Sequence, residues 1–267
     1  MAAQIKVAVC GALGRMGQTV TSIILGRPDM LLAGAVEHPA CPALGREIGA
    51  AEAPVILAGS LGQGAGKADV YIDFTSVESS LAYLDEAVQL KLAAVIGTTG
   101  LGAAEHKKLE AAAKHIPVLW APNMSVGVNA MFKMAAIMTK MLGPEYDIEI
   151  MEAHHHHKKD APSGTALKLH DVVARARNLD PAKTLLTGRT GQVGERTRDE
   201  IAVLALRGGD IVGDHTVYFC GPGERLELTH RAQTRDTFAQ GAVRAAAWLA
   251  GKKPGLYSID DTISFDL

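Results

Sequence analysis

The stretch IKVAVCGALGRMG, from Ile5 to Gly17, decides the fold. Its first six residues are almost continuously apolar, which is typical of a strand that is buried on both faces. Three glycines follow, at positions 11, 14 and 17, and residues 15–25 have helical spacing. Glycine is needed where the chain turns sharply, where the backbone approaches a pyrophosphate and where a helix packs closely on a strand. The stretch therefore predicts a strand, a turn and a helix that together bind a dinucleotide.

The next strand-like run, Met30–Glu37, ends in an acidic residue. Glu37 lies 20 residues after Gly17, where a carboxylate that binds the adenosine ribose is expected. The N–H groups at the start of the predicted helix would face the phosphates. Because the spacing GxxGxxG is less common than GxGxxG, a plain strand-to-helix turn is the alternative interpretation.

The residues around Glu37 also bear on the choice of cofactor. A carboxylate accepts hydrogen bonds from both ribose hydroxyls, which favours NADH, whereas the 2′-phosphate of NADPH requires cations. Arg15 and His38 are the candidate cations, and a histidine is only partly charged at neutral pH. We expect the chain to use both NADH and NADPH, with NADH at least as effective.

Strand-like and helix-like segments continue to alternate up to Asn123. This alternation predicts a parallel sheet with right-handed crossovers. The further strands are expected at Asp69–Thr75, Ala93–Gly100 and Pro117–Asn123, and the helices between them at Val77–Gln89 and Ala103–Lys114.

After Asn123 the pattern changes. In the run YDIEIMEAHHHH, residues 146–157, Ile148 and Ile150 alternate with Glu149 and Glu152, which predicts a strand with one apolar and one polar face. The strand-like runs His215–Gly221 and Arg225–Ala232 are joined by Gly-Pro-Gly-Glu and are expected to form an antiparallel hairpin. The helices are expected at Val126–Leu142, Gly164–Arg177 and Phe238–Ala250, and the other strands at Ile201–Arg207, His215–Gly221 and Arg225–Ala232.

The predicted fold class is therefore α/β, a Rossmann-like doubly wound parallel sheet, with a second α+β domain built on a mixed or antiparallel sheet. We place a dinucleotide-binding domain at residues 1–125, with residues 237–267 returning to it. Residues 126–236 are expected to form a domain for substrate binding and oligomerisation.

The composition limits the function classes. The 267 residues include 48% hydrophobic and 21% charged residues with a net charge of −2, which gives no general attraction to nucleic acid or anionic membranes. Three distant cysteines predict neither a disulfide framework nor a zinc ribbon and fit a reducing compartment. The N-terminus lacks the pattern of a secretory signal, and the apolar run 126–142 contains one asparagine and two lysines. We expect a cytoplasmic protein without nucleic-acid or membrane partners.

Four consecutive histidines, His154 to His157, follow the predicted strand. An internal run this short is no purification tag. On a strand, His154 with His156, or His155 with His157, would face one side and could bind a metal ion, but only Asp160 is an obvious further ligand nearby. A solvated polar run is the other structural interpretation. On balance we expect no metal.

The same segment also has the composition of a catalytic site. A bend at the end of the strand could direct His154 and His155 into one cleft, and Lys158 follows closely. Ser163 is a plausible helix N-cap, and Gly164 and Thr165 would present N–H groups and a hydroxyl at the positive end of a helix, where a carboxylate could bind. A proton donor, cations and an anion-binding turn suit a substrate that carries carboxylates and a reducible centre.

The run EAHHHHKKDAPSGTA (Glu152–Ala166) resembles the signature of the 4-hydroxy-tetrahydrodipicolinate reductase (dihydrodipicolinate reductase) family of bacterial lysine and diaminopimelate synthesis. The resemblance covers essentially the whole chain, and the histidine–lysine block is far more specific than the glycines. The other similar segments, in order, are VAVCGALGRMG (Val7–Gly17), YIDFT (Tyr71–Thr75), VIGTTG (Val95–Gly100), APNMSVGVN (Ala121–Asn129), GDIVGDHTVYF (Gly209–Phe219) and ERLELTHRAQTRDTFAQGAVRAAAWL (Glu224–Leu249).

This resemblance implies NAD(P)H-dependent reduction of 4-hydroxy-tetrahydrodipicolinate, via dihydrodipicolinate, to tetrahydrodipicolinate with loss of water. It implies cofactor contacts along the carboxyl ends of several strands. These are Gly11, Ala12, Leu13, Gly14, Arg15 and Met16 at the pyrophosphate, Glu37 at the ribose with His38 beside it, and Gly97, Thr98, Thr99, Ala121, Pro122, Asn123 and Met124 at the nicotinamide.

For the substrate, a dicarboxylate cyclic imine, the resemblance implies His154 as proton donor and Lys158 as a second donor. His155, Gly164 and Thr165 would bind the carboxylates, with Ser163 at the start of the same turn. It also implies a homotetramer formed through the sheet of the second domain. Members that favour NADPH often carry arginine where this chain has His38. Two other functions stay open: another two-domain oxidoreductase acting on an amino-acid aldehyde or keto acid, and a nucleotide sensor without turnover.

Overall fold

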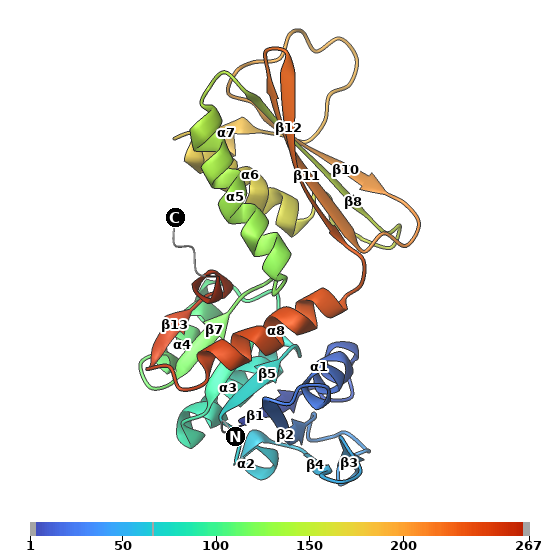
Figure 1. Cartoon of the computed structure of the whole chain (residues 1–267), viewed down its shortest axis with the longest axis vertical. Coiled ribbons are helices and arrows are strands. Elements are labelled where there is room, and N and C mark those ends of the chain that lie inside the picture. The colour runs from blue at the N-terminus through green and yellow to red at the C-terminus, as the bar shows by residue number, and fades with distance from the viewer. Residues whose placement is uncertain (1–3, 66, 264–267) are drawn as a thin grey trace. The chain divides into compact units, whose positions relative to one another are not determined.

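The computed structural model of the chain describes residues 4–65 and 67–263. These residues form two compact units (Figure 1). The first unit contains the chain up to Val126 and again from Asp236 onward, and the second contains Gly127–Arg235. No helix within the described residues is long and apolar enough to cross a membrane.

The first unit is built on an eight-stranded sheet with the strand order β13-β7-β6-β5-β1-β2-β4-β3. Its strand pairs are parallel except β3 with β4, which confirms the predicted parallel sheet. The strands are β1 (Ile5–Cys10), β2 (Met30–Val36), β3 (Glu47–Ile48), β4 (Val55–Ala58), β5 (Val70–Asp73), β6 (Ala93–Ile96), β7 (Pro117–Trp120) and β13 (Gly255–Tyr257).

Helices cover both faces of this sheet because its central strands are apolar on both sides. Alternate residues of β1 belong to two separate cores: Val7 and Val9 pack with α1 and α8, whereas Ala8 and Cys10 pack with α3 and α4. The sheet is therefore doubly wound, as the sequence predicts. The helices are α1 (Arg15–Leu25), α2 (Leu61–Gly64), α3 (Val77–Leu90), α4 (Ala103–Ala112), α8 (Asp236–Leu249) and the 3₁₀ helix η1 (Ile259–Thr262).

The second unit has a mixed five-stranded sheet with the order β12-β11-β8-β10-β9. β8 pairs parallel with β10 and antiparallel with β11, and β11 and β12 form the predicted antiparallel hairpin. The strands are β8 (Asp147–His154), β9 (Leu185–Leu186), β10 (Ile201–Arg207), β11 (Gly213–Gly221) and β12 (Glu224–Ala232), and the helices are α5 (Val126–Leu142), α6 (Gly164–Ala176) and α7 (Pro181–Thr184).

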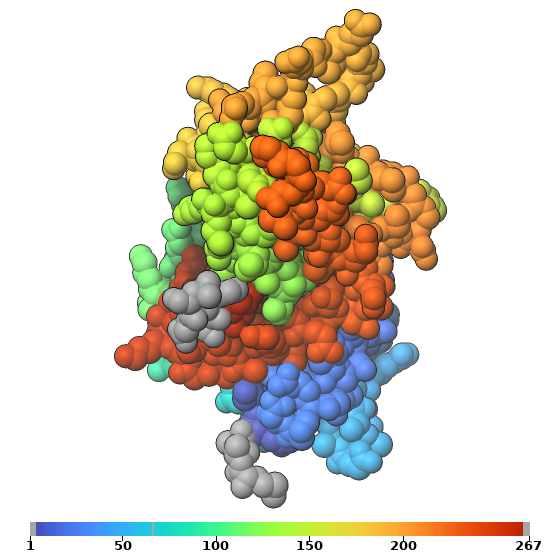
Figure 2. All heavy atoms as spheres, turned by 45° about the horizontal axis from the view of Figure 1, so that its top comes forward, coloured from blue at the N-terminus to red at the C-terminus, as the bar shows by residue number. Residues whose placement is uncertain are grey.

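One face of this sheet is covered by α5 and α6. Ile148 and Ile150 of β8 pack there with helix residues such as Met131 and Leu169. The segment between β9 and β10 projects from the unit (Figure 2). Arg189 of that segment is held at its base by ion pairs to Glu149 and Glu200 at 2.8 and 2.5 Å.

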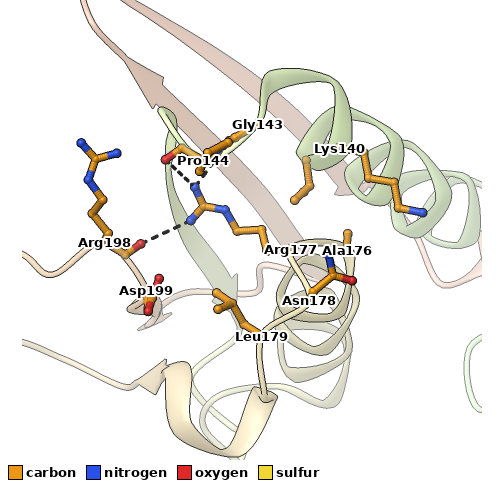
Figure 3. A pocket seen from close by; sticks show the side chains of 10 residues that line it. Lys140, Gly143, Pro144, Ala176, Arg177, Asn178, Leu179, Arg198 and Asp199 are labelled. Carbon is orange, nitrogen blue, oxygen red and sulfur yellow. Dashed lines mark hydrogen bonds between the residues drawn. The ribbon is translucent and has the colours of Figure 1, made fainter.

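A cavity of about 580 Å³ lies in the second unit where α5 and α6 end (Figure 3). Arg177, directly after α6, donates to the carbonyl oxygens of Pro144 and Tyr146 at 3.0 and 2.7 Å. Burial, and then the charge of Arg196, lower the pKa of this guanidinium. Arg177 therefore satisfies carbonyl groups of the loop that follows α5.

Candidate active site

The glycine turn of the first unit joins β1 directly to α1. Gly11 has φ +66°, a left-handed conformation that favours glycine, and its carbonyl accepts the N–H of Gly14 at 2.9 Å. Gly14 is the N-cap of α1 and has no side chain to cap the helix, so the first N–H groups are left to solvent or to a bound anion. Gly17 lies against the turn with no room for a Cβ. This geometry fits a pyrophosphate-binding turn.

Glu37 lies beside this turn. Its carboxylate accepts the N–H of Leu13 at 3.1 Å and the N–H of His38 at the same distance. His38 is exposed, and its Nδ1 accepts the N–H of Ala40 at 3.2 Å, which leaves only Nε2 for another partner. Arg15 is exposed at the first turn of α1. The structure thus brings the predicted ribose carboxylate to the glycine turn.

The turn also lies where the strand order reverses. β1 has β2 on one side and β5 on the other, and Cys10 is opposite Asp73 in the parallel register. A Cβ on Gly11 would lie 2.7 Å from Cγ2 of Thr75, so the loops after β1 and β5 are in contact. Ligands of open α/β sheets bind at such a point, outside the carboxyl ends of the strands.

Asp73 is a site residue for which the sequence pattern predicts no role. It is fully buried and accepts the N–H and hydroxyl of Thr75 at 2.9 and 2.6 Å, the hydroxyl of Thr98 at 3.1 Å and that of Ser80. Burial raises the pKa of this carboxyl in spite of these donors. Asp73 therefore ties together the loops after β5 and β6. The signal in the sequence is an acidic residue directly after the apolar run Val70–Ile72.

The predicted nicotinamide contacts divide into buried and accessible residues. The hydroxyl of Thr98 points inward to Asp73, and the carbonyl of Thr98 accepts the indole N–H of Trp120 at 3.2 Å. Thr99 is exposed. Any Cβ on Gly97 would overlap the ring of Phe74, at 2.2 Å from Cε1, so glycine is required there.

The segment after β7 is also held by packing. Ala121 and Met124 are buried, Pro122 is exposed, and the side-chain oxygen of Asn123 accepts a backbone N–H at 2.9 Å. A Cβ on Gly241 of α8 would lie 1.7 Å from the carbonyl oxygen of Met124. The last helix of the unit therefore packs directly against this segment.

Glu152 corrects one expectation in the second unit. The sequence pattern predicts Glu152 on the polar face of β8 with Glu149, but its side chain is 0% exposed and lies on the same face as Ile148 and Ile150. It shares their even-numbered positions, and successive strand residues alternate between faces. Arg207 donates two hydrogen bonds to its carboxylate at 2.7 and 2.8 Å, which compensates the burial of the charge.

His154 is joined to this carboxylate. Its Nδ1 lies 2.7 Å from Oε2 of Glu152, and 11% of its side chain is exposed. Oε1 of Glu152 accepts the backbone N–H of Ser163 at 2.9 Å. Burial by itself raises the pKa of the Glu152 carboxyl, but the hydrogen bonds from Arg207, His154 and Ser163 outweigh it and hold that pKa below its usual range. The carboxylate therefore connects the histidine run to the start of α6.

Ser163 and His215 complete the cluster. Ser163 Oγ accepts the N–H of Ala166 at 3.2 Å as the N-cap of α6, and it lies 3.1 Å from Nε2 of His215. Its hydroxyl is thus occupied, whereas Gly164 is exposed and has open space around it. His215 is buried, and burial with the nearby His154 lowers its pKa to about 4.

His155 and Lys158 follow His154 in the same run. The N–H of His155 donates to the carbonyl of Ile211 at 2.7 Å, and lost hydration with the charge of Arg235 lowers the pKa of His155. Lys158 forms an ion pair with Asp160 at 2.9 Å. Across residues 4–65 and 67–263, no group of three or more His, Cys, Asp or Glu side chains is arranged to hold a metal ion.

Comparison with known proteins gives one family. The model described as dihydrodipicolinate reductase, N-terminus, matches residues 5–124, and the model described as dihydrodipicolinate reductase, C-terminus, matches residues 127–263. The chain is 46% identical to the 4-hydroxy-tetrahydrodipicolinate reductase of Anaeromyxobacter dehalogenans over 97% of both chains. It is 47% identical to that of Syntrophotalea carbinolica, over 97% of this chain and 98% of the relative.

A solved structure is also similar. The dipicolinate-bound dihydrodipicolinate reductase from Paenisporosarcina sp. TG-14 has a TM-score of 0.77 and 24% identity, with 97% of this chain and 100% of that chain covered. At this identity the likeness shows the two-part fold.

Proposed function

This chain belongs to the dihydrodipicolinate reductase family, and we propose on that premise that it reduces 4-hydroxy-tetrahydrodipicolinate, via dihydrodipicolinate, to tetrahydrodipicolinate with NADH or NADPH. The reaction belongs to lysine and diaminopimelate biosynthesis. The resemblance drawn from Glu152–Ala166 is thereby confirmed. The observation that carries the proposal is the buried Glu152, which joins the ring of His154 to the start of α6.

The first unit is proposed to bind the cofactor. The left-handed Gly11, the uncapped start of α1 and the carboxylate of Glu37 support a pyrophosphate and a ribose at the carboxyl end of β1. A bound nicotinamide cofactor would supply the hydride. Thr99 and Pro122 are exposed at the ends of β6 and β7 and are proposed to contact its nicotinamide end.

The second unit is proposed to bind the substrate and supply the proton. The N–H groups of Gly164 and Thr165, at the positive end of α6, are proposed to bind one carboxylate, and His155 the other. Hydride addition to C4 of the conjugated imine moves electrons toward the ring nitrogen, and the resulting enamine takes a proton at C3. His154 is proposed as the donor, and Lys158 as a second donor that also balances the substrate charge.

We further propose that the chain forms a homotetramer through the sheet face that α5 and α6 leave uncovered. Met151 of β8 and Leu206 of β10 are 43% and 49% exposed on that face. Sedimentation equilibrium should give four chains, and Met151→Glu should reduce that number because it buries a charge in an apolar interface. Leu256→Glu, at a residue of the first unit that is 45% exposed, is the control.

We propose the cytoplasm as the compartment of this protein, because its three free cysteines suit a reducing environment.

A coupled assay tests the activity. A dihydrodipicolinate-type synthase, pyruvate and aspartate semialdehyde generate the unstable substrate, and loss of NADH or NADPH is followed at 340 nm. We expect oxidation that depends on the synthase. Absence of oxidation with either cofactor, in protein that binds NADH, would contradict the reductase and favour a nucleotide sensor.

A further inference from the structure

The carboxylate of Glu152 is buried, charged and fully engaged. Arg207 occupies both of its oxygens, Ser163 donates its N–H to Oε1, and His154 contacts Oε2 through Nδ1. A carboxylate held from three sides has no freedom to turn away from the imidazole. Because it is acceptor-only, the atom of His154 that faces it must carry the proton.

The other ring nitrogen of His154 lies beside Gly213 of β11. A Cβ at that position would be 3.0 Å from Nε2, so the glycine leaves room next to this atom. The structure gives Nε2 no hydrogen-bond partner among residues 4–65 and 67–263. The ring of His215 stands nearly perpendicular at 5.2 Å and, being uncharged at neutral pH, brings no competing cation. One nitrogen is therefore fixed and the other is available.

We propose that Glu152 is a positioning residue for the reduction: it fixes a proton on Nδ1 of His154, so that Nε2 is the atom that transfers a proton to the substrate. This inference rests on the proposed function, in which His154 is the donor. Arg207 keeps the carboxylate ionised and oriented, and Gly213 keeps Nε2 accessible.

The proton and electron balance fixes what the histidine must do. Hydride addition would bring two electrons and one hydrogen to C4, and a bound nicotinamide cofactor would be their source. The enamine electron pair then takes the proton from Nε2, so that the N–H bond breaks, a C–H bond forms at C3 and the imine is restored. His154 ends neutral with its remaining proton on Nδ1, where Glu152 accepts it. If the neutral ring carried its proton on Nε2, the next proton from solvent would have to add to Nδ1. That atom faces Glu152 and is not the one that transfers a proton to the substrate.

The first experiment is nitrogen-15 NMR of histidine-labelled wild-type protein above pH 8, with His154→Gln used to assign the resonance. We expect the neutral ring of His154 to carry its proton on Nδ1. A predominantly Nε2-protonated ring would overturn the proposal. This measurement needs no turnover and no variant of Glu152, so it separates the proposal from the activity itself.

The second experiment is kinetic. Glu152→Gln should lower kcat roughly 10- to 100-fold, a part of what a positioned acid contributes, with KM for the substrate within about threefold. In the His154→Gln background the same change should cost less than about twofold, because Glu152 acts through that ring. The full loss in that background would overturn the proposal.

Glu149→Gln is the matched control. Glu149 lies on the same strand, is also paired with an arginine, and faces the other side of the sheet. Its substitution should leave kcat within about twofold.

If Glu152→Gln does not fold, Arg207→Lys is the second test. It keeps the positive charge but loses the two-point contact with the Glu152 carboxylate, so it should raise the Nε2-protonated fraction of His154. Should wild-type protein show the Nδ1 proton but no turnover, the proposed function and the transfer from Nε2 both fall.

Discussion

A Cβ atom on Gly17 would lie 2.0 Å from the carbonyl oxygen of Gly11, so α1 packs on the turn that precedes it with no space for a side chain. The atoms in the way belong to the backbone, which cannot move aside as a flexible side chain can. Gly17 is thus required by packing, while Gly11 is required by its left-handed conformation.

We therefore expect Gly17→Ala to lower the free energy of unfolding by about 3 kcal/mol and to weaken NADH binding, because α1 must move away from the turn. Chemical denaturation and fluorescence titration with NADH measure the two effects. Gly188→Ala is the control, since a Cβ there meets nothing within 4 Å, and it should change stability by less than about 0.5 kcal/mol. Equal stability of the two variants would show that the turn is looser than the structure indicates.

The choice of cofactor is expected to depend on position 38. His38 is exposed next to Glu37, and one of its ring nitrogens is already used within its own turn. His38→Arg adds a permanent cation with several donors, so kcat/KM for NADPH relative to NADH should rise about fivefold. Initial rates with each cofactor in the coupled assay measure the ratio. An unchanged ratio would place the 2′-phosphate away from this residue.

The stability of the second unit should depend on pH through His215. Its pKa falls from 6.5 to about 4 on folding, so the unfolded chain binds more protons between these values. The free energy of unfolding is therefore not reduced by His215 above pH 6.5. It falls by about 3 kcal/mol as the pH is lowered to 4.

The variant His215→Gln keeps an N–H group near Ser163 without a titrating ring, and its unfolding free energy should change less between pH 7 and 4.5. Denaturant titrations followed by circular dichroism give the comparison. His115→Gln, at an exposed histidine of the first unit, should leave the wild-type pH dependence intact. Parallel curves for wild type and His215→Gln would assign the pH dependence to other groups.

Arg177 is expected to stabilise the second unit through carbonyl groups. Arg177→Met keeps much of the apolar stem but removes the donors to Pro144 and Tyr146, so the free energy of unfolding should fall by about 2 kcal/mol. Arg175→Ala is the control, because its exposed ion pair with Asp171, four residues away in α6, is worth less than about 0.5 kcal/mol. Similar losses in the two variants would mean that the carbonyl groups find water instead.

Much of the fold could be predicted from continuous or periodic apolar patterns. The bounds of β1, α1, α5 and β10 agree with the predicted ranges. The expected strands that end at Thr75, Gly100 and Asn123 are shorter in the structure, because strand-like residues continue into the loops after β5, β6 and β7. The short strands β4 and β13 were not predicted, since runs of three or four residues carry no periodic signal.

Within the candidate site, local patterns indicated the residues but not their partners. The parity of Glu152 with Ile148 could have placed it on the buried face, but only the pairing of β8 with β10 brings Arg207 to it. The sequence places His215 on a strand and assigns it no partner, whereas in the structure it is buried against Ser163, a residue 52 positions away. Such contacts depend on the register of strands that are distant in the sequence.

The chain enters the first unit, leaves it at Val126 and returns at Asp236. α8, which belongs to the returning segment, supplies Ala242, Val243 and Leu249 to the core that also contains Val7 and Val9. During synthesis on the ribosome, one face of the nucleotide-binding sheet therefore stays uncovered until more than a hundred later residues have been made. The inserted unit is a single continuous segment and can complete its core first, so the domain that begins the chain is the last to finish folding.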